Sequence, residues 1–336
     1  MKGIFILFIS ITFIYAETGI ESLIYTQFQK FITKYHKKYS SLEEYLSRFA
    51  VFRLNFIDTL KSGQKSYLVG ITKFSDLTPQ EFKKKYLNLE IPVTSFLNQR
   101  QPKIKLPKSV PDSWDWRDHI PISYVWDQSS CNAGYLFSTI CNLESIYAIN
   151  KGNYKTLSLQ YFIDCDTYDS GCSGGLMEST FKWLVQFGGG LMTDADYPYT
   201  GYKGTCKADS SKYIDMSVTG FINLGGVSSS FSPADEGEMK EYVYEVGALA
   251  VGVNGTPLQT YSGGIIDLSN DKCNPMGINH ACAIIGYGTE NGLDYWIVKN
   301  SYGSSWGEDG FFRIARGKGT CGINMYVLSG IVKFNQ

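Results

Sequence analysis

The chain has 336 residues, a formal net charge of −1 and a hydrophobic content of 43%. This length can bury a large core and allows one to three domains, whereas the near-zero charge gives no reason to expect binding to nucleic acid or to an anionic membrane. No cluster of His, Cys or carboxylate residues has metal-ligand spacing, so we predict no metal and no other cofactor.

The N-terminus has the pattern of a secretory signal. Met1 and Lys2 precede an apolar run from Ile4 to Ile14, which is too short to span a bilayer and is followed by the small residue Ala16. We predict a signal peptide over 1–16. No later segment offers about eighteen uninterrupted apolar residues, so we expect no membrane span.

The remaining chain divides into a basic part and an acidic part. Residues 17–105 carry a formal charge of +7, and residues 106–336 carry −9. Charges of opposite sign would attract the two parts to each other. A chance distribution of solvated charges is the alternative explanation.

Two helices and a short motif are predicted in the basic part. The first helix has aromatic residues at helical spacing: Tyr25, Phe28, Phe31 and Tyr35. The second has a polar and aromatic pattern at helical spacing: Glu44, Arg48, Phe52 and Asn55. A motif of the form Gly-x-Thr-x-Phe-x-Asp follows over residues 70–76, and residues 77–82 have the pattern of a helix start.

These patterns resemble, in the same order, the two signatures of the inhibitory prosegment of papain-family cysteine proteases. The second half of the first signature is degraded, because Thr59 and Gly63 stand where the family has Ile and Asn. Beyond Leu87 the composition becomes that of a polar linker, where processing could occur. The resemblance therefore implies a prosegment with its linker over 17–105.

The segment from Gln128 to Ser138 resembles the active-site segment of the same family, Gln-Gly-x-Cys-Gly-Ser-Cys-Trp-Ala-Phe-Ser. Matched residue by residue, Gln128 takes the place of the oxyanion-hole glutamine, and Gly134 takes the place of the nucleophilic cysteine. Glycine has no side chain that could attack a carbonyl. The sequence therefore predicts that this chain does not cleave peptides by the family's mechanism.

Helical signals continue from Tyr135 to Asn150 with hardly any polar face, which predicts a helix buried on most sides. Its N-terminus would stabilise a thiolate at position 134, where the chain has none. From about Met216 the pattern changes to short β-branched and aromatic runs, which predict antiparallel, barrel-like packing. The clearest runs are Leu249 to Val253, Ala281 to Tyr287, Tyr295 to Val298 and Phe311 to Ala315.

Two motifs in this second half also resemble the family. Asn279-His280-Ala281 is similar to the segment of the catalytic histidine, and the run from Lys299 to Glu308 is similar to the segment of the orienting asparagine, here Asn300. In a working enzyme the histidine takes the thiol proton and the asparagine holds the imidazole. For His36 and His119, which lie in polar surroundings, we expect no catalytic role.

The resemblance implies an α+β fold of papain type. We expect a left, mainly helical domain over about 106–215, a right antiparallel β-barrel domain over about 216–336, a cleft between them and a helical propeptide in front. The implied peptide-binding residues are Gly174, Gly175, Leu176, Met177, Gly252, Ala281 and Tyr326. Paired glycines let a backbone lie close to an extended peptide. Tyr326 should partly fill the main specificity pocket.

Eight cysteines in a secreted chain imply disulfides. By the family's motifs, the resemblance implies the pairs Cys131–Cys172, Cys165–Cys206 and Cys273–Cys321. Cys141 and Cys282 then remain, and they lie below positions 134 and 280 on facing surfaces, because i+7 on a helix and i+2 on a strand return to the same face. Two buried free thiols are the favoured state, and a fourth bridge is the alternative.

Three hypotheses about function follow. The favoured one is a catalytically inactive homologue that binds peptides or proteins through its cleft. The second is an active cysteine endopeptidase with a displaced nucleophile, Ser138 or Cys141, and the third is a storage or structural protein. The expected partners are the chain's own prosegment and a peptide or protein ligand. We expect a monomer in the secretory pathway, extracellular or lysosomal.

Overall fold

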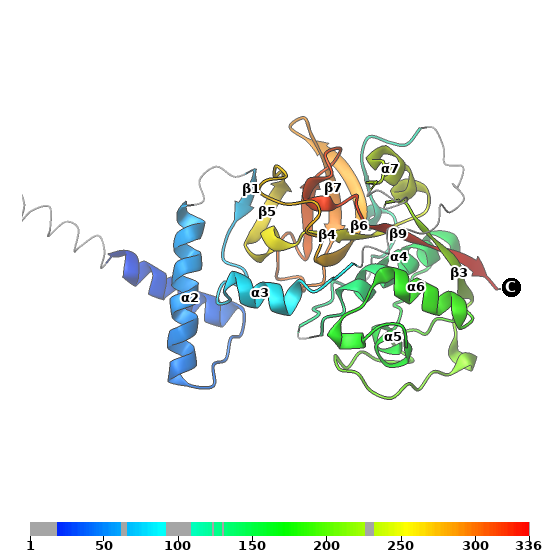
Figure 1. Ribbon diagram of the computed structural model, residues 1–336, viewed down its shortest axis with the longest axis horizontal. Helices are drawn as coiled ribbons and strands as arrows, with labels where there is room; N and C mark the ends of the chain where they lie inside the picture. Colours follow the sequence, from blue (N-terminus) through cyan, green and yellow to red (C-terminus); the bar gives the residue numbers. More distant parts are fainter. Residues whose placement is uncertain are drawn as a thin grey trace, which may run out of the picture.

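The computed structural model describes residues 19–61, 66–91, 109–122, 124–129, 131–225 and 232–335. The predicted signal peptide, most of the linker and the predicted boundary at residue 106 lie outside these ranges. Figure 1 shows the N-terminal helices at one side of a larger body, in which a sheet and a group of helices lie next to each other. The α+β fold with a helical N-terminal part is confirmed.

The first two helices form a small core of their own. A helix over residues 19–34 packs against α2 (Leu42–Lys61). Their buried residues are Ile24, Phe28, Phe31 and Phe52. Tyr25, which shares the predicted helical spacing, is 52% exposed, and its ring contacts Phe49 edge to face.

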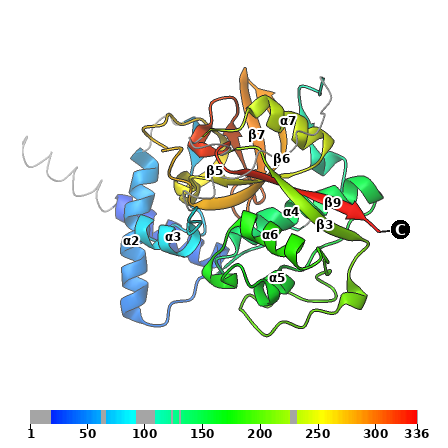
Figure 2. The same ribbon diagram turned by 45° about the vertical axis from the view of Figure 1, so that its right-hand side comes forward.

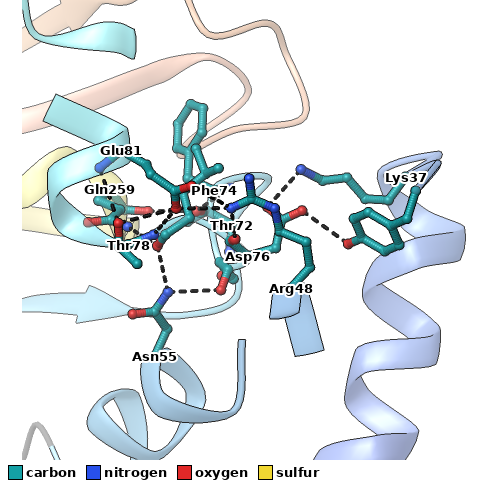
Figure 3. A network of polar contacts seen from close by, with 12 residues as sticks. Lys37, Arg48, Asn55, Thr72, Phe74, Asp76, Thr78, Glu81 and Gln259 are labelled. Atoms are coloured by element: carbon teal, nitrogen blue, oxygen red, sulfur yellow. Dashed lines mark hydrogen bonds and ion pairs between the residues drawn. The ribbon is translucent and has the colours of Figure 1, made fainter. Parts of the chain in front are cut away.

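A polar network connects α2 to the segment that follows it (Figure 3). Arg48 donates to both carboxylate oxygens of Glu81, and Asn55 Nδ2 donates to the backbone oxygens of Ser75 and Leu77. Glu81 also completes a capping box with Thr78 at the start of α3 (Pro79–Tyr86). The polar residues predicted at helical spacing on α2 therefore hold the segment that contains α3 in place.

The N-terminal part is joined to the rest of the chain through backbone and apolar contacts. Strand β1 (Tyr67–Val69) pairs antiparallel with β5 (Tyr261–Ile266) of the large sheet. Thr72 Oγ1 donates to the backbone oxygen of Gln259, whose side chain donates back to Leu77 O, as Figure 3 shows in part. Among the described residues, one ion pair crosses this contact, between Lys73 and Asp127. In the described ranges, the opposed net charges thus produce few direct ion pairs between the two parts.

The helical half is organised around α4 (Gly134–Lys151), which is buried over nearly its whole length. It ends at Gly152, whose φ of +66° suits the left-handed C-cap that glycine adopts without strain. Helices α5 (Leu159–Cys165) and α6 (Met177–Gln186) pack against it. The prediction of a helix that is buried on most sides is confirmed.

The second half is one large sheet covered by α7 (Glu236–Glu245). Its other strands are β2 (Trp114–Asp115), β3 (Met216–Asn223), β4 (Leu249–Val253), β6 (His280–Glu290), β7 (Leu293–Lys299), β8 (Phe311–Ala315) and β9 (Val327–Phe334). The strand order is β1-β5-β8-β7-β6-β4-β9-β3, with β2 paired to β6. Pairing is antiparallel except between β5 and β8, which are parallel. In Figure 2, β3 and β9 extend toward the helices, where they contact α6 and α4.

Short 3₁₀ helices complete the described elements: η2 (Trp116–Asp118), η3 (Gly171–Ser173), η4 (Ser210–Lys212), η5 (Thr256–Gln259) and η6 (Thr320–Gly322). None of the helices in the described ranges has the length and apolar character needed to cross a membrane.

Three disulfides join Cys131 to Cys172, Cys165 to Cys206 and Cys273 to Cys321. These are the pairs that the family's motifs implied. Cys141 and Cys282 are both buried and free, so the fourth bridge is absent from this structure.

Candidate functional site

Four residues from distant parts of the sequence meet where the two halves join. Gly134 is the first residue of α4, His280 begins β6, and Asn300 directly follows β7. A Cβ atom built on Gly134 would lie 3.7 Å from Cε1 of His280 and 3.6 Å from Oε1 of Gln128. A side chain at position 134 would therefore enter the space between the imidazole and the glutamine amide.

The imidazole of His280 is oriented by Asn300. Nε2 of His280 lies 2.8 Å from Oδ1 of Asn300, and this oxygen also accepts a hydrogen bond from the backbone of Ser301. Because a carbonyl oxygen can only accept, Nε2 carries the proton, and in the neutral ring Nδ1 keeps its lone pair. The structure therefore brings the two residues into the pairing expected from the sequence motifs.

His280 is buried by its neighbours. The ring of Tyr302 stacks on it with the ring centroids 5.0 Å apart, and the side chains of both residues are inaccessible or nearly so. Burial lowers the pKa of His280 to about 4, against the opposing effect of its hydrogen bonds to Asn300 and to the backbone of Tyr86. The imidazole is therefore neutral above about pH 4 in this arrangement.

Gln128 is held in place by a residue that the sequence analysis did not single out. Ser301 Oγ donates to Oε1 of Gln128 over 2.6 Å, and the backbone N–H of Gln128 donates to Ser301 O. The remaining Nε2 group of Gln128 is buried and has no hydrogen-bond partner in the described part of the chain. Only the position of Ser301 next to Asn300 in the sequence could have pointed to this role.

The paired glycines lie beside the same site. Gly174 has a φ of +111°, which favours glycine. A Cβ atom at Gly175 would come within 2.6 Å of both Asp169 and the ring of Tyr135. Asp169 Oδ1 accepts from the N–H of Leu176, which fixes this segment just before α6 begins at Met177. The local backbone therefore requires glycine at both positions.

Tyr326 lies in the apolar core of the helical half. Its side chain is fully buried, and the N–H of Glu178 donates to its hydroxyl over 3.2 Å. It shares one apolar cluster with Ala281 and Met177, and its Cβ and Cδ1 atoms pack against Gly252. Of the residues expected to bind peptide, Gly175 and Ala281 line the small cavity next to Gly134 and His280.

The N-terminal part crosses the site just after α3. The N–H of Leu89 donates to Asn279 O over 3.0 Å, and Leu89 packs in the cluster that contains Tyr326. Asn88 and Leu89 enclose a small cavity with Gly134 and His280. The residues beyond Leu87 were predicted to be a polar linker, because they have no periodicity that reveals their binding partner.

The two free thiols do not reach this site as nucleophiles. Burial raises the pKa of Cys141 to about 11, and it raises that of Cys282 further. Both side chains are at most 4% exposed. A buried thiol that stays protonated reacts slowly, since the thiolate is the nucleophile.

Comparison with known proteins identifies the family to which this chain belongs. The model of the papain family cysteine proteases matches residues 110–331, and that of the cathepsin propeptide inhibitor domain matches residues 28–82. Cysteine protease XCP2 of Arabidopsis thaliana is 36% identical over 307 residues, which cover 88% of this chain and 83% of that protein. Viral cathepsin of Adoxophyes honmai nucleopolyhedrovirus is 35% identical over 311 residues, which cover 88% of each chain.

The solved structure of digestive procathepsin L 3 from the larval midgut of Tenebrio molitor is similar throughout. It has a TM-score of 0.77 and 32% sequence identity, and the match covers 92% of this chain and 99% of that one. The chain belongs to the papain family of cysteine proteases, with an N-terminal cathepsin propeptide inhibitor domain.

Proposed function

We propose that this chain is a catalytically inactive papain-family protein that binds peptides or proteins through its cleft. The observation that carries the proposal is Gly134. It lies at the N-terminus of α4, beside His280 and Gln128, where a nucleophilic side chain would meet the imidazole. The chain keeps the base, the orienting asparagine and the glutamine amide, but it has no atom at this position that can attack a carbonyl.

Neither candidate for a displaced nucleophile fits an active enzyme. Ser138 is 1% exposed, and its hydroxyl donates to Tyr135 O, so it is turned into the helix. Cys141 is buried with a raised pKa. A nucleophile must approach the carbonyl to about 3 to 3.5 Å, and neither side chain is open to a peptide. These observations favour the inactive homologue over a peptidase.

We further propose that the protein works in the secretory pathway, either outside the cell or in a lysosome. Its three disulfides suit an oxidising compartment. The apolar sequence before residue 17 supports the same compartment. A storage or structural role remains the alternative if the cleft binds nothing.

We expect the protein to hydrolyse no cathepsin-type fluorogenic peptide, even at pH 4.5 after its prosegment has been removed. In subtilisin, removing the nucleophile lowers turnover by about a million-fold. A papain-family enzyme with a cysteine at this position serves as the control at equal concentration. Turnover within about a thousand-fold of that enzyme, blocked by a thiol-directed epoxide, would contradict the proposal.

A further inference from the structure

Helix α2 of the prosegment exposes leucines on the side that faces away from its core. Only Phe52 of its 20 residues is buried. Four leucines of the helix are largely exposed: Leu42 (72%), Leu46 (54%), Leu54 (61%) and Leu60 (57%). Figure 1 shows α2 at the side of the molecule opposite to the C-terminus. Single exposed leucines are common, but a continuous apolar surface marks an interaction site.

The exposed apolar residues form one continuous row. An α-helix turns by about 100° per residue, so Leu46, Ala50, Leu54 and Ile57 fall within about 80° of each other on the side opposite Phe52. Ala50 and both leucines are exposed, and Ile57 is partly buried. We call these four residues the α2 stripe. The helix is therefore apolar on two sides, one of which is covered by the chain itself.

Opposite charges lie at the two ends of the α2 stripe. Glu43 is in the first turn of the helix and Lys61 is in the last, and both are exposed on the same side as the stripe. The ion pairs of α2 in the described ranges are made by Arg48 and Arg53 with acidic residues of the same chain. Glu43 and Lys61 are therefore the charges that a partner of the stripe would meet.

This row of residues is complementary to itself. A second copy in antiparallel orientation, related by a two-fold axis at the level of Phe52, faces each residue with the one equally far on the other side of the axis. Glu43 then lies opposite Lys61 of the second copy. The small side chain of Ala50 meets the large one of Leu54, as interdigitated packing requires. Leu46 meets Ile57 at the same level, so each half of the stripe fits the other half.

Other arrangements fit this row less well. A parallel second copy would place Glu43 next to its own equivalent and Lys61 next to its own, and like charges repel. It would also align the two helix dipoles, whereas antiparallel helices oppose them. An anionic membrane surface is disfavoured, because Glu43 and Asp58 border the stripe and surface-binding helices carry mainly basic residues there.

We propose that the chain, with its prosegment in place, forms an antiparallel homodimer through the α2 stripe. The inference is independent of the proposed function, and it differs from the monomer expected from the sequence. The contact is about 27 Å long, from Glu43 to Lys61 at about 1.5 Å per residue. A contact of one helix pair belongs to the small interfaces, below about 1,200 Å², that associate transiently. Because the stripe lies in the prosegment, loss of the prosegment would dissolve the dimer.

Sedimentation equilibrium tests the oligomeric state. The full chain, lacking only the predicted signal peptide, is measured from about 1 to about 200 µM, where small interfaces dissociate reversibly. We expect a monomer–dimer equilibrium. The double variant Leu46→Gln/Leu54→Gln keeps good helix formers and removes four leucines from each dimer, so it should raise the dissociation constant at least about a hundredfold. Leu68→Gln on β1, where the leucine is 66% exposed, is the matched control and should leave it unchanged.

Charge reversal tests the antiparallel register. Glu43→Lys and Lys61→Glu each put like charges at both ends of the dimer, so each variant alone should raise the dissociation constant about tenfold. In an equimolar mixture of the two variants, opposite charges meet again at both ends. The mixture should therefore form a heterodimer about as tight as the wild-type dimer, and this recovery also shows that both variants are folded.

Three results would overturn the inference: a wild-type chain that stays monomeric up to the highest concentration, a dimer that survives Leu46→Gln/Leu54→Gln unchanged, or a mixture of the charge variants that associates no better than either alone. None of these substitutions touches the cleft around Gly134, so each of these results would leave the proposed function intact.

Discussion

Gly134→Cys is expected to give this protein a fast-reacting thiol. The new side chain would enter the space beside His280, at the N-terminus of α4. Both the imidazole and the helix end lower a thiol's pKa. With the prosegment removed, a thiol-directed epoxide at pH 6 should therefore label the variant at least about tenfold faster than free cysteine.

The same variant should still cleave peptides poorly. Tyr326 is fully buried, and we expect it to fill the pocket that orients the substrate. Beside position 134, Asn132 Oδ1 is buried and has no hydrogen-bond partner among the described residues. A substrate misplaced by about 1 Å can lose on the order of a hundred-fold in rate. We expect turnover at least that far below an ordinary family member, measured with a fluorogenic peptide.

Tyr326→Ala in the Gly134→Cys background separates the two effects. It should raise turnover while leaving the labelling rate unchanged, because it opens the pocket that we expect to orient the peptide and leaves His280 and Gln128 in place. If Gly134→Cys alone hydrolyses peptides as fast as an active relative, then the cleft still positions its substrate correctly. A thiol no faster than free cysteine would show that His280 does not act on position 134.

Protonation of His280 at acidic pH should favour release of the prosegment. The pKa of His280 is about 4 with the prosegment in place, against an ordinary value of 6.5, mainly because of burial. Between these values the released form binds the extra proton, so protonation favours release and affinity falls as the pH drops from 6.5 toward 4. Above pH 6.5 both forms are neutral and this effect disappears.

The dissociation constant of residues 17–105 from residues 106–336 should therefore rise between pH 7 and pH 4.5, by at most roughly fiftyfold from this residue alone, the limit reached if release restores the ordinary pKa of 6.5. His280→Gln should remove that part of the pH dependence. His119→Gln is the matched control, since His119 stacks on Trp114 instead of facing the prosegment. A His280→Gln variant with the same pH dependence as the wild type would show that other groups control release.

Much of the fold was predictable because its signals are local. The apolar run from Tyr135 to Asn150 is found as α4, and the strand runs 249–253 and 311–315 are found as β4 and β8 with the same bounds. The repeat of Arg48 and Asn55 predicted a helix, and both residues then contact the segment around Glu81. Periodicity and short motifs carry this information without knowledge of the partner.

The features that were not predicted depend on contacts between distant residues. Nothing in Tyr67 to Val69 identifies β5 as its partner, and Leu89 lies in a stretch with no periodicity. The parallel pairing of β5 with β8 likewise depends on chain topology. At the site, the sequence placed Gln128, Gly134, His280 and Asn300 through motifs, but not the hydrogen bond from Ser301 that fixes the glutamine. These contacts form only in the folded core, so the spacing of residues in the sequence does not reveal them.

The most direct test of the central claim is the intact mass of the native protein after treatment with a vinyl sulfone peptide probe. With the prosegment removed, the wild type should gain no adduct, because Gly134 has no thiol and Cys141 and Cys282 are buried with raised pKa values. Gly134→Cys should gain one. A stoichiometric adduct on the wild type, together with peptide turnover that the same probe blocks, would contradict the account of an inactive cleft.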